Sequence, residues 1–391
     1  MIEADIGTPN GVTQSAGSLR PPPVLRSRSE RTRAVQVGTP LQRISVEISR
    51  RCNLRCVYCY ADSSPNRDPG LSNAELEMVI REAVELGACL VSIVGGGEPL
   101  LRDALLVDGQ SCIDQANALG CYCSLYTNCT LVDGRAARWL ASRDVSVVGK
   151  LNSLREAVQD ELSAVPGSAR TIMRGIELLL EAGLGRSEPS RLGLETIICR
   201  QNYDEIPTMW RWMRDRNIVP EVEIPTLQGR ARSNGASLYF DPREAPNKYR
   251  VLFEELLRID REHYGFDWIP HPPFAALSCR LYYTNCYVNE RGGVQPCAGV
   301  DREYGQLRVG AERARGLPLA EILNGEAFRK LRHVHDHVAA PCRGCELGHS
   351  CYGCRGAAWN LTGDEFAADP VCWRGRTCSP TGSTPRRQER S

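Results

Sequence analysis

Three cysteines stand close together near the start of the chain. Cys52, Cys56 and Cys59 lie in the segment RRCNLRCVYCY with the spacing C-x3-C-x2-C. Thiolates at this spacing can hold three irons of a cubane iron–sulfur cluster. No fourth cysteine nearby completes the set, so one iron would keep an open position, which a catalytic metal site needs. The spacing therefore predicts a cluster that can bind a small molecule.

A second group of cysteines lies in the C-terminal part of the chain. The run CRGCELGHSCYGC has the spacing C-x2-C-x5-C-x2-C, and a G-x4-C step leads from Gly292 to Cys297. Eight thiolates suffice for two fully ligated cubanes, but CxxC pairs also bind zinc, so a pair of zinc ribbons stays open. The eight residues are Cys279, Cys286, Cys297, Cys342, Cys345, Cys351, Cys354 and Cys372.

Alternating strands and helices must position the first group. Strands are expected at 43–48, 90–94, 121–126, 145–148, 192–198 and 221–224, and helices at 73–86, 171–181 and 204–214. Ser72 and Glu75 form a capping box for the first of these helices. The alternation implies parallel βα units, whose chemistry sits at the carboxyl ends of the strands. Cys52 follows the first strand and the turn GGGEP (95–99) follows the second, so both belong at that end.

Composition limits the partners and the compartment. The 48 Lys and Arg residues against 47 Asp and Glu give a net charge of +1, which provides no general attraction to nucleic acid or an anionic membrane. No apolar run approaches the roughly 18 residues of a membrane span, and the N-terminus has no signal-peptide pattern. Eighteen cysteines in a reducing compartment suggest metal or redox sites. We therefore expect a cytoplasmic protein without nucleic-acid or membrane partners.

The expected domain organisation has five parts. The Pro-, Arg- and Ser-rich N-terminus cannot bury much surface and is expected to be disordered, and the segment GRARSNGASLYFDPREAPNK resembles a linker. The parts are a disordered segment 1–41, a barrel 42–235, a linker with one helix 236–270, a cysteine-rich domain 271–375 and a flexible tail 376–391.

The first cysteine group, the aromatic Tyr58 within it and the GGGEP turn resemble the radical S-adenosylmethionine (SAM) enzymes, over about 43–235. This resemblance implies a partial (β/α)6 TIM-like barrel in which the open iron binds the amino and carboxylate groups of SAM. One electron, from a donor such as flavodoxin or ferredoxin, then cleaves SAM to methionine and a 5′-deoxyadenosyl radical. That radical removes a hydrogen atom from the substrate, while the protein positions the groups and excludes water.

The resemblance also assigns SAM contacts. Gly96, Gly97 and Glu98 would contact the methionine part of SAM, because glycines let backbone groups approach a ligand closely. Tyr58 would lie near the adenine. Further expected contacts are Asn128, in LYTNCTL, and Asn202, after the fifth strand.

One stretch departs from the family pattern. Many relatives carry Ser-x-Asp after the fourth strand, where this chain reads VVGKLNSL and has Lys150 and Asn152. A lysine at the mouth of a barrel can pair with SAM or with an anionic group of the substrate. We therefore expect Lys150 to act at the site.

The second cysteine group resembles the SPASM extension of radical SAM enzymes, over about 271–375, which holds two auxiliary [4Fe-4S] clusters. With the SAM-binding cluster this makes three clusters. By resemblance, Cys279, Cys286, Cys297 and Cys354 would ligate the cluster nearer the active site. Cys342, Cys345, Cys351 and Cys372 would ligate the outer one.

Two auxiliary clusters favour a net two-electron oxidation, because a nearby cluster can accept the electron left on the substrate radical. We expect dehydrogenation of a small polar natural product of the sugar or aminocyclitol type. A redox-neutral epimerase stays open, with Cys129 or Cys199 as the thiol that returns a hydrogen atom.

A peptide maturase, which crosslinks or oxidises a peptide, also stays open. About 41 residues precede the first strand, whereas peptide-modifying relatives often carry a folded recognition domain there, so the peptide is the less favoured substrate. A non-catalytic iron–sulfur or zinc protein is the remaining alternative.

Overall fold

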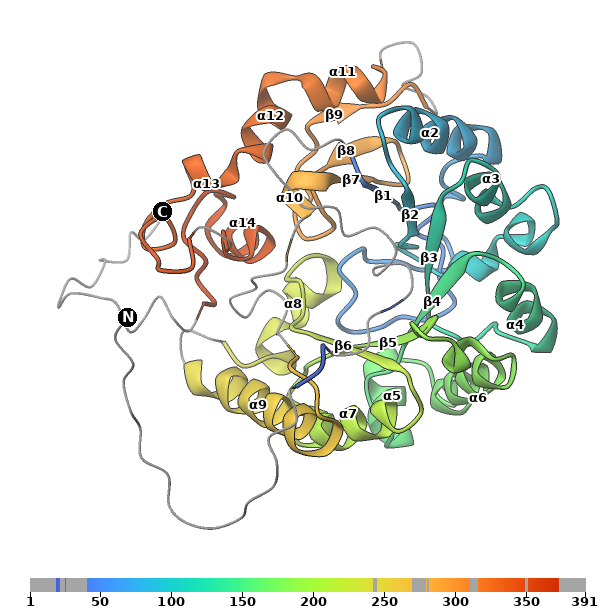
Figure 1. Ribbon diagram of the computed structural model, residues 1–391, viewed down its shortest axis with the longest axis vertical. Coiled ribbons are helices and arrows are strands. Elements are labelled where there is room, and N and C mark those ends of the chain that lie inside the picture. Colours follow the sequence, from blue (N-terminus) through green and yellow to red (C-terminus); the bar gives the residue numbers. More distant parts are fainter. Residues whose placement is uncertain are drawn as a thin grey trace.

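The structure, a computed structural model, describes residues 19–21, 25, 41–241, 245–268, 279, 281–309, 316–348 and 351–372. Its centre is a curved nine-stranded sheet in the order β6-β5-β4-β3-β2-β1-β7-β8-β9 (Figure 1). The strands are β1 Arg43–Val46, β2 Leu90–Ile93, β3 Tyr122–Thr127, β4 Val145–Lys150, β5 Leu192–Ile197, β6 Val219–Glu223, β7 Asn285–Val288, β8 Gly293–Gln295 and β9 Gly305–Gln306.

The sheet is a partial barrel, as the sequence predicted. Strands β1 to β6 pair in parallel, and β6 and β9 are the two unpaired edges. Strand β7 pairs in parallel with β1, and the short strands β8 and β9 continue antiparallel. The cysteine-rich region therefore begins by extending the sheet of the barrel.

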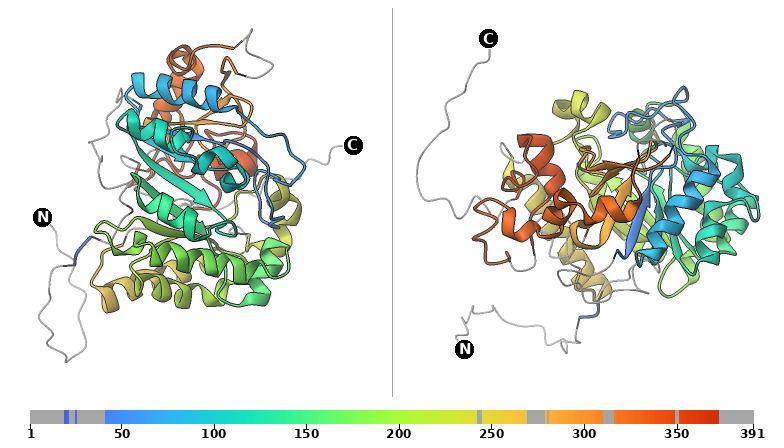
Figure 2. Two further views of the ribbon diagram at one scale, coloured as in Figure 1. Left: turned by 90° about the vertical axis from the view of Figure 1, so that its right-hand side faces the viewer. Right: turned by 90° about the horizontal axis from the view of Figure 1, so that it is seen from above.

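Helices cover the outer face of this sheet (Figure 2). Around the barrel they are α2 Asn73–Glu85, α3 Cys112–Ala118, α4 Gly134–Ala141, α5 Glu156–Ser163, α6 Ser168–Glu181 and α7 Ile206–Arg214. After β6 come α8 Gly229–Leu238, α9 Pro246–Ile259, α10 Leu281–Thr284, α11 Leu319–Asn324, α12 Glu326–Arg332, α13 Val334–His337 and α14 Arg355–Thr362. Short turns of other helix types are η1 Pro99–Leu101, η2 Asp103–Leu106, η3 Leu184–Arg186, η4 Tyr203–Glu205 and the π-type η5 Asp260–Tyr264.

Local sequence explains why α2 begins where it does. The Ser72 hydroxyl accepts from the Glu75 amide at 3.3 Å, and the Ser72 amide donates to the Glu75 carboxylate at 2.8 Å. This is the predicted capping box, which satisfies two backbone groups that the helix leaves unpaired. The short helices α3, α4 and α5 were not predicted, because each presents fewer than three turns of apolar periodicity.

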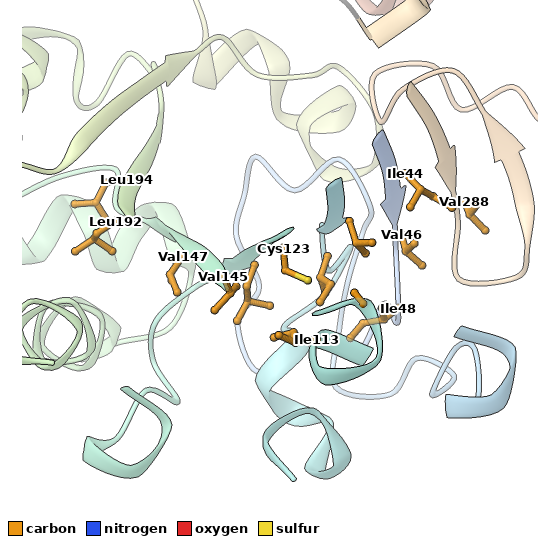
Figure 3. Packing of buried hydrophobic residues seen from close by; sticks show 14 of the residues in the cluster. Ile44, Val46, Ile48, Ile113, Cys123, Val145, Val147, Leu192, Leu194 and Val288 are labelled. Carbon is orange, nitrogen blue, oxygen red and sulfur yellow. The ribbon is translucent and has the colours of Figure 1, made fainter. Parts of the chain in front are cut away.

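Side chains alternate between the two faces of the strands. Ile44, Val46 and Val288 pack with other buried apolar residues beneath the helices (Figure 3). Ser45 and Tyr287, their neighbours along the strands, line the barrel interior. A strand places successive side chains on opposite faces, so the outer face forms the core and the inner face is free for chemistry.

Two expectations about chain organisation change. The segment predicted as a linker after Gly229 forms helix α8, because Ala231, Gly235 and Leu238 bury one side of an otherwise polar segment. Within the segment expected to be disordered, Leu25 is 1% exposed and packs against Val148 and Val219. The rest of residues 1–40, apart from 19–21, and the predicted tail 376–391 lie outside the described residues.

None of the helices in the described ranges is both long enough and apolar enough to cross a membrane.

Candidate active site

A cavity of about 780 Å³ occupies the interior of the barrel. Its wall includes the first cysteine group, the glycine turn and the inward-facing residues of several strands. Cys279, Cys297 and Cys354 of the second group line another part of the same cavity. The volume lies within the roughly 300–1,000 Å³ of ligand pockets. Thiols of both predicted kinds of cluster therefore border one cavity of ligand size.

The loop after β1 brings the first three thiols together at the carboxyl end of the barrel. Backbone amides of Leu54 and Ser63 donate to the sulfurs of Cys52 and Cys59, at 3.4 and 3.5 Å. Burial raises the pKa of the Cys52 thiol to about 12 and that of Cys56 to about 11. Iron binding would therefore release protons from these thiols, and the amide donors suit the negative sulfurs of a cluster.

The glycine turn is held against this loop by its backbone. The Gly97 amide donates to the Ser49 carbonyl at 2.8 Å, and a Cβ atom at Gly97 would come within 1.9 Å of the Arg51 carbonyl oxygen. Gly96 has a φ of +65°, and a Cβ atom there would meet the Glu47 carboxyl. Both glycines are thus required by contact with the cysteine loop, a reason that differs from the predicted close approach to SAM.

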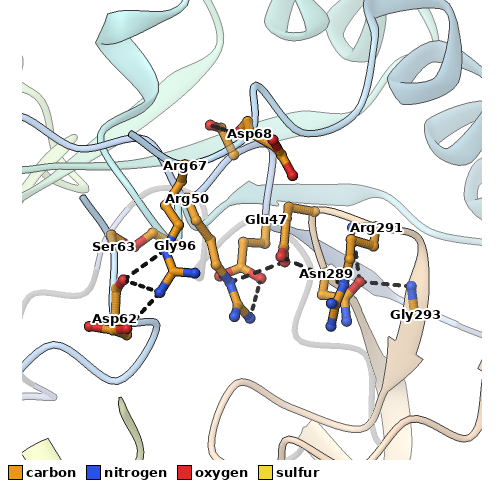
Figure 4. Close-up of polar contacts among 12 residues, drawn as sticks. Glu47, Arg50, Asp62, Ser63, Arg67, Asp68, Gly96, Asn289, Arg291 and Gly293 are labelled. Carbon is orange, nitrogen blue, oxygen red and sulfur yellow. Dashed lines mark hydrogen bonds and ion pairs between the residues drawn. The ribbon is translucent and has the colours of Figure 1, made fainter. Parts of the chain in front are cut away.

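Figure 4 shows the polar contacts behind this turn. The Ser63 hydroxyl donates to the Gly96 carbonyl, and Arg50 pairs with the Glu47 carboxyl at 3.2 Å. Burial raises the pKa of Glu47 to about 8, since Arg50 offsets only part of the cost of desolvation. These contacts fix the turn relative to the loop that carries Cys52 and Cys59.

Glu98 and Asn128 both lie on the cavity wall. The Glu98 carboxylate accepts from the Asn128 amide at 2.6 Å and from the Thr127 hydroxyl at 2.8 Å, and so ties the end of β2 to β3. Burial raises the pKa of Glu98 to about 7. The Asn128 side-chain amide donates to the Cys52 sulfur at 3.8 Å. Both residues therefore belong to the site, and Asn128 touches the first cysteine group directly.

Lys150, Tyr58 and Asn152 form a connected set beside the cysteine loop. The Lys150 ammonium pairs with Glu195 at 2.9 Å and lies 5.6 Å from the centre of the Tyr58 ring. The Tyr58 hydroxyl accepts from the Asn152 amide at 2.6 Å. Lys150, Tyr58 and Glu195 all line the cavity. Sequence analysis missed Glu195, although its inward position on the fifth strand follows from strand alternation.

Asn202 does not reach the cavity. It is fully buried, and its amide group donates to the carbonyls of Asn152 and Ile197, at 2.6 and 2.9 Å. Its side-chain oxygen accepts from the Cys199 amide at 2.7 Å. The predicted role as a SAM contact is therefore wrong: its two N–H donors are used, and it ties the loop after β4 to β5.

The two thiols predicted as hydrogen donors also lie away from the cavity. Cys129 is fully buried behind the sheet, and a Cβ atom at Gly149 would come within 2.7 Å of its sulfur. Cys199 is fully buried in a small cluster with Tyr58 and Leu162. Neither is among the residues that line the cavity. Cys89, at the amino end of β2, does line it, and its thiol donates to the Gln42 carbonyl at 3.4 Å.

Three of the four thiols predicted for the inner auxiliary cluster face the cavity. The Tyr352 hydroxyl donates to the Cys279 sulfur at 3.2 Å, and the Ala357 amide donates to that of Cys354 at 3.4 Å. Burial raises the pKa of Cys297 to about 12. Hydrogen bonds of this kind stabilise thiolate ligands, so these three positions fit a cluster.

Cys286 is the exception. It lies within β7 and is paired in register with Ile44 of β1. Like Ile44, it is fully buried in the core on the outer face, and it is not part of the cavity wall. The structure therefore does not bring it together with the other three, because strand alternation turns its side chain to the far side of the sheet.

The outer auxiliary group lies further along the C-terminal region. The amide of Asp369 donates to the Cys342 sulfur at 3.3 Å, and that of Gly353 donates to the Cys351 sulfur at 3.4 Å. Burial raises the pKa of Cys351 to about 11, and the nearby thiols of Cys372 and Cys342 add to this. Cys345 completes the turn, with the Leu347 amide donating to its sulfur at 3.5 Å.

The described thiols do not form a ready-made site for a single metal ion. Among the residues that the structure describes, no three His, Cys, Asp or Glu side chains are close enough to hold one metal ion. A tetrahedral zinc site with Zn–S bonds of about 2.3 Å would gather its thiolates to about 4 Å from one another. A cubane spreads its ligands over four irons instead.

Two arginines at the site were also missed. Arg230 of α8 donates to the Cys56 carbonyl at 2.9 Å and pairs with Asp62 at 2.7 Å; it was hidden because its segment resembled a linker. Arg355, 1% exposed, follows Cys354 and lines the cavity. Its position after the CYGC run was visible in the sequence, but its burial was not.

Two family models match the chain. The radical SAM superfamily model matches residues 46–213, and the model of the SPASM iron–sulfur cluster-binding domain matches residues 279–346. These ranges contain the first cysteine group and the start of the second.

The chain is also similar to several known proteins along most of its length. An AdoMet-dependent heme synthase of Oleidesulfovibrio alaskensis is 26% identical over 371 residues, covering 87% of this chain and 89% of that protein. A PqqA peptide cyclase of Bradyrhizobium diazoefficiens is 26% identical over 353 residues, covering 88% of each. The structure of anSMEcpe with AdoMet and a peptide has a TM-score of 0.64 at 16% identity, covering 85% of this chain and 94% of that one. This last likeness shows the fold.

Proposed function

Because the chain belongs to the radical SAM superfamily and carries a C-terminal SPASM iron–sulfur domain, we propose that it oxidises a substrate in the barrel cavity by two electrons. When bound, the first cluster and SAM supply a radical that removes a hydrogen atom from a C–H bond. The observation that carries the proposal is the shared cavity, whose wall includes Cys52, Cys56 and Cys59 as well as Cys279, Cys297 and Cys354.

The surroundings of the cavity support oxidation over epimerisation. An epimerase needs a donor that returns a hydrogen atom to the substrate, and neither Cys129 nor Cys199 reaches the cavity wall. An oxidase needs an electron acceptor, and the inner auxiliary group supplies thiols for one at the wall. Cys89 does line the cavity, so a substitution of Cys89 tests the epimerase alternative.

The residues of the barrel would bind and orient the reactants. Glu98 and Asn128 fix the end of β3 beside Cys52, so they would hold SAM in register with the first cluster. The Lys150–Glu195 pair would orient a polar substrate group, since both partners are about four-fifths buried and line the cavity. Apolar residues such as Leu54 and Ile197 complete the wall and would limit the access of water to the reacting carbon.

The residues that line the cavity also indicate the class of substrate. Charged residues of both signs line the cavity, including Arg43, Lys150, Glu195 and Glu223, so we propose a polar substrate with ionisable or hydroxyl groups. The sugar or aminocyclitol expected from the sequence is one such molecule, but the similar proteins are named for heme and for the PqqA peptide. A peptide is therefore a second candidate, supported by the match to PqqA peptide cyclase over 88% of both chains.

A turnover assay tests this proposal. The reconstituted full chain would be reduced anaerobically with SAM and a panel of sugars, aminocyclitols, an iron porphyrin with propionate groups and the PqqA peptide. We expect 5′-deoxyadenosine and, for one class, a product two hydrogens lighter without solvent deuterium when the reaction is run in deuterated water. Formation of an isomer that carries solvent deuterium would reject oxidation. Absence of 5′-deoxyadenosine from fully loaded protein would reject the enzyme itself.

A further inference from the structure

Leu25 belongs to the N-terminal segment, but its side chain packs against strands of the barrel. It is 1% exposed and forms a small buried cluster with Val148 and Val219, and Tyr126 packs against the same cluster. A Cβ atom at Gly193 would come within 3.2 Å of a Leu25 methyl carbon. A glycine within a strand often marks a place where another part of the chain approaches closely. Gly193 therefore leaves the space that Leu25 fills.

The residues around Leu25 form one row across neighbouring strands. Tyr126 of β3 lies opposite Val148 of β4. Gly193 of β5 lies opposite both Val148 and Val219 of β6. Tyr126 and Val148 also line the cavity, so this row faces the interior of the barrel. Leu25 thus covers an inner row that runs from β3 to β6.

The next inward-facing row, two residues closer to the carboxyl ends of the strands, is charged. Lys150 lies opposite Glu195, and Glu195 lies opposite Glu221. Inward-facing side chains of a strand are two residues apart, so Leu25 lies on the amino-terminal side of this charged row. Lys150 and Glu195 are largely buried and pair at 2.9 Å. Leu25 therefore separates a buried ion pair from the amino end of the barrel.

A second contact anchors the N-terminal segment. The Arg20 amide donates to the Gly265 carbonyl, and the Asp267 amide donates to the Arg20 carbonyl, both at 2.9 Å. The Arg20 guanidinium also lies 5.4 Å from the centre of the Phe266 ring, which is within the range of a cation–π contact. Three of the four residues between Arg20 and Leu25 are prolines. Proline restricts φ, so this short connection has less conformational entropy to lose when Leu25 docks.

We propose that Leu25 is a positioning residue of the site. It closes the amino end of the cavity between β3 and β6, excludes water from the Lys150–Glu195 pair, and so fixes this pair for the substrate. Opposite charges interact more strongly where water is excluded, and a fixed pair holds a polar group in one orientation. The closure rests on the packing of Leu25 alone, whereas the effect on the substrate also rests on the proposed function.

The reactivity of the lysine amino groups tests the closure without any substrate. The described lysines are Lys150, Lys248 and Lys330, and the last two are exposed, so they serve as references. The loaded full chain with SAM would be labelled with a trace of N-hydroxysuccinimidyl acetate, and mass spectrometry would give the acetylation of each lysine. L25A should raise the relative labelling rate of Lys150 by about tenfold, which corresponds to about 1.4 kcal/mol of lost protection.

Two variants separate this closure from a general loss of packing. L25M keeps an apolar side chain of similar volume, which cores tolerate well, and should restore the wild-type labelling of Lys150. L179A removes an equally buried leucine from helix α6 and should leave Lys150 as it is in the wild type. An unchanged rate in L25A, or an equal rise in L179A, would overturn the proposal.

Gly193 gives an approach that leaves Leu25 in the sequence. G193A places a Cβ atom against the Leu25 methyl carbons, so it should displace Leu25 and raise the labelling of Lys150. An unchanged rate in G193A would contradict the proposal, and this result does not depend on whether L25A folds. In the double variant L25A/G193A the two effects should be less than additive, as expected for residues in contact. Fully additive effects would show that the two residues act independently, and would also contradict it.

The effect on catalysis is measured with any panel substrate that the wild type oxidises. L25A should give less product per 5′-deoxyadenosine, because a loosely held substrate does not keep its C–H bond in position, and L25M should restore the yield. Raised labelling in a protein that oxidises none of the panel substrates would uphold the closure while the proposed function fails. Raised labelling with an unchanged yield from L25A would overturn the positioning role and leave the proposed function standing.

Discussion

The two cysteine regions supply thiols to one cavity by different routes. The first region places Cys52, Cys56 and Cys59 on one loop after β1, and the glycine turn after β2 packs against that loop. The inner auxiliary group draws Cys279, Cys297 and Cys354 from three segments that are distant in sequence and meet only in the folded chain. A ligand set within one loop can be read from its spacing. A set gathered across the fold also depends on which face each element presents.

Cys286 illustrates this difference. In the sequence, Cys286 cannot be distinguished from the other seven cysteines of the second group, and eight cysteines match two complete cubanes. In the structure, the register of β7 turns it into the core opposite Ile44. The number of cysteines therefore overestimates the number of ligands wherever a thiol falls on the apolar face of a strand.

The largest expected effect comes from removing a ligand of the first region. C59A should abolish SAM cleavage and lower the iron content by about four per chain, because no other thiol lies on that loop to replace it. Both auxiliary clusters should remain, since none of their ligands is on the loop. Iron analysis and a 5′-deoxyadenosine assay, with C123A as the control, check this; cleavage by C59A at the rate of C123A would refute it.

A smaller effect is expected at the glycine turn. G97A should reduce SAM cleavage by about a hundredfold, the scale of a misplacement of about 1 Å at an active site, because its Cβ atom would collide with the Arg51 carbonyl. G120A is the control for replacing a glycine by alanine: Gly120, unlike Gly97, has a positive φ, of +76°, and it has open space around its Cβ position.

The control should lose only about 1 kcal/mol of stability through backbone strain and keep its activity. The initial rate of 5′-deoxyadenosine formation and the thermal midpoint separate the two effects. Equal rates for G97A and G120A would contradict the role assigned to the contact with Arg51.

The inner auxiliary cluster should respond to its phenol donor. The hydrogen bond from the Tyr352 hydroxyl to the Cys279 sulfur stabilises the reduced, more negative state of the cluster, and Y352F removes this bond. The reduction potential of the inner auxiliary cluster should therefore fall by several tens of millivolts in Y352F, since about 59 mV corresponds to a tenfold change for one electron. Y282F is the control, because the Tyr282 hydroxyl is buried without a hydrogen-bond partner among the described residues. Redox titration followed by EPR measures both, and equal potentials would refute the assignment.

The smallest effect is expected for the thiols outside the ligand sets. C89A, C129A and C199A should each oxidise the substrate within about twofold of the wild type per loaded cluster, because an oxidation needs no hydrogen donor. C89A is the informative variant, since Cys89 lines the cavity, and C129A and C199A act as buried controls. Loss of product from C89A, with 5′-deoxyadenosine still formed in the presence of substrate, would instead support epimerisation.

Much of this architecture could be predicted from the sequence. The alternation of expected strands and helices predicts the six barrel strands, and Ser72 with Glu75 predicts the start of α2. The predictions that the structure does not support are those that depend on tertiary structure. Asn202 follows a strand as Asn128 does, but only the fold shows that its amide is used by Asn152 and Ile197. Helix α8 was missed because low apolar content concealed the residues that bring Arg230 to the cysteine loop.

The central claim is that both cysteine regions hold iron–sulfur clusters around one cavity. Its most direct test is the iron, labile sulfide and zinc content of the anaerobically prepared full chain. Three cubanes predict about twelve irons and twelve sulfides per chain without zinc. About four irons together with zinc would leave the first region as described, but would contradict the account of the second and remove the electron acceptor that the proposed oxidation requires.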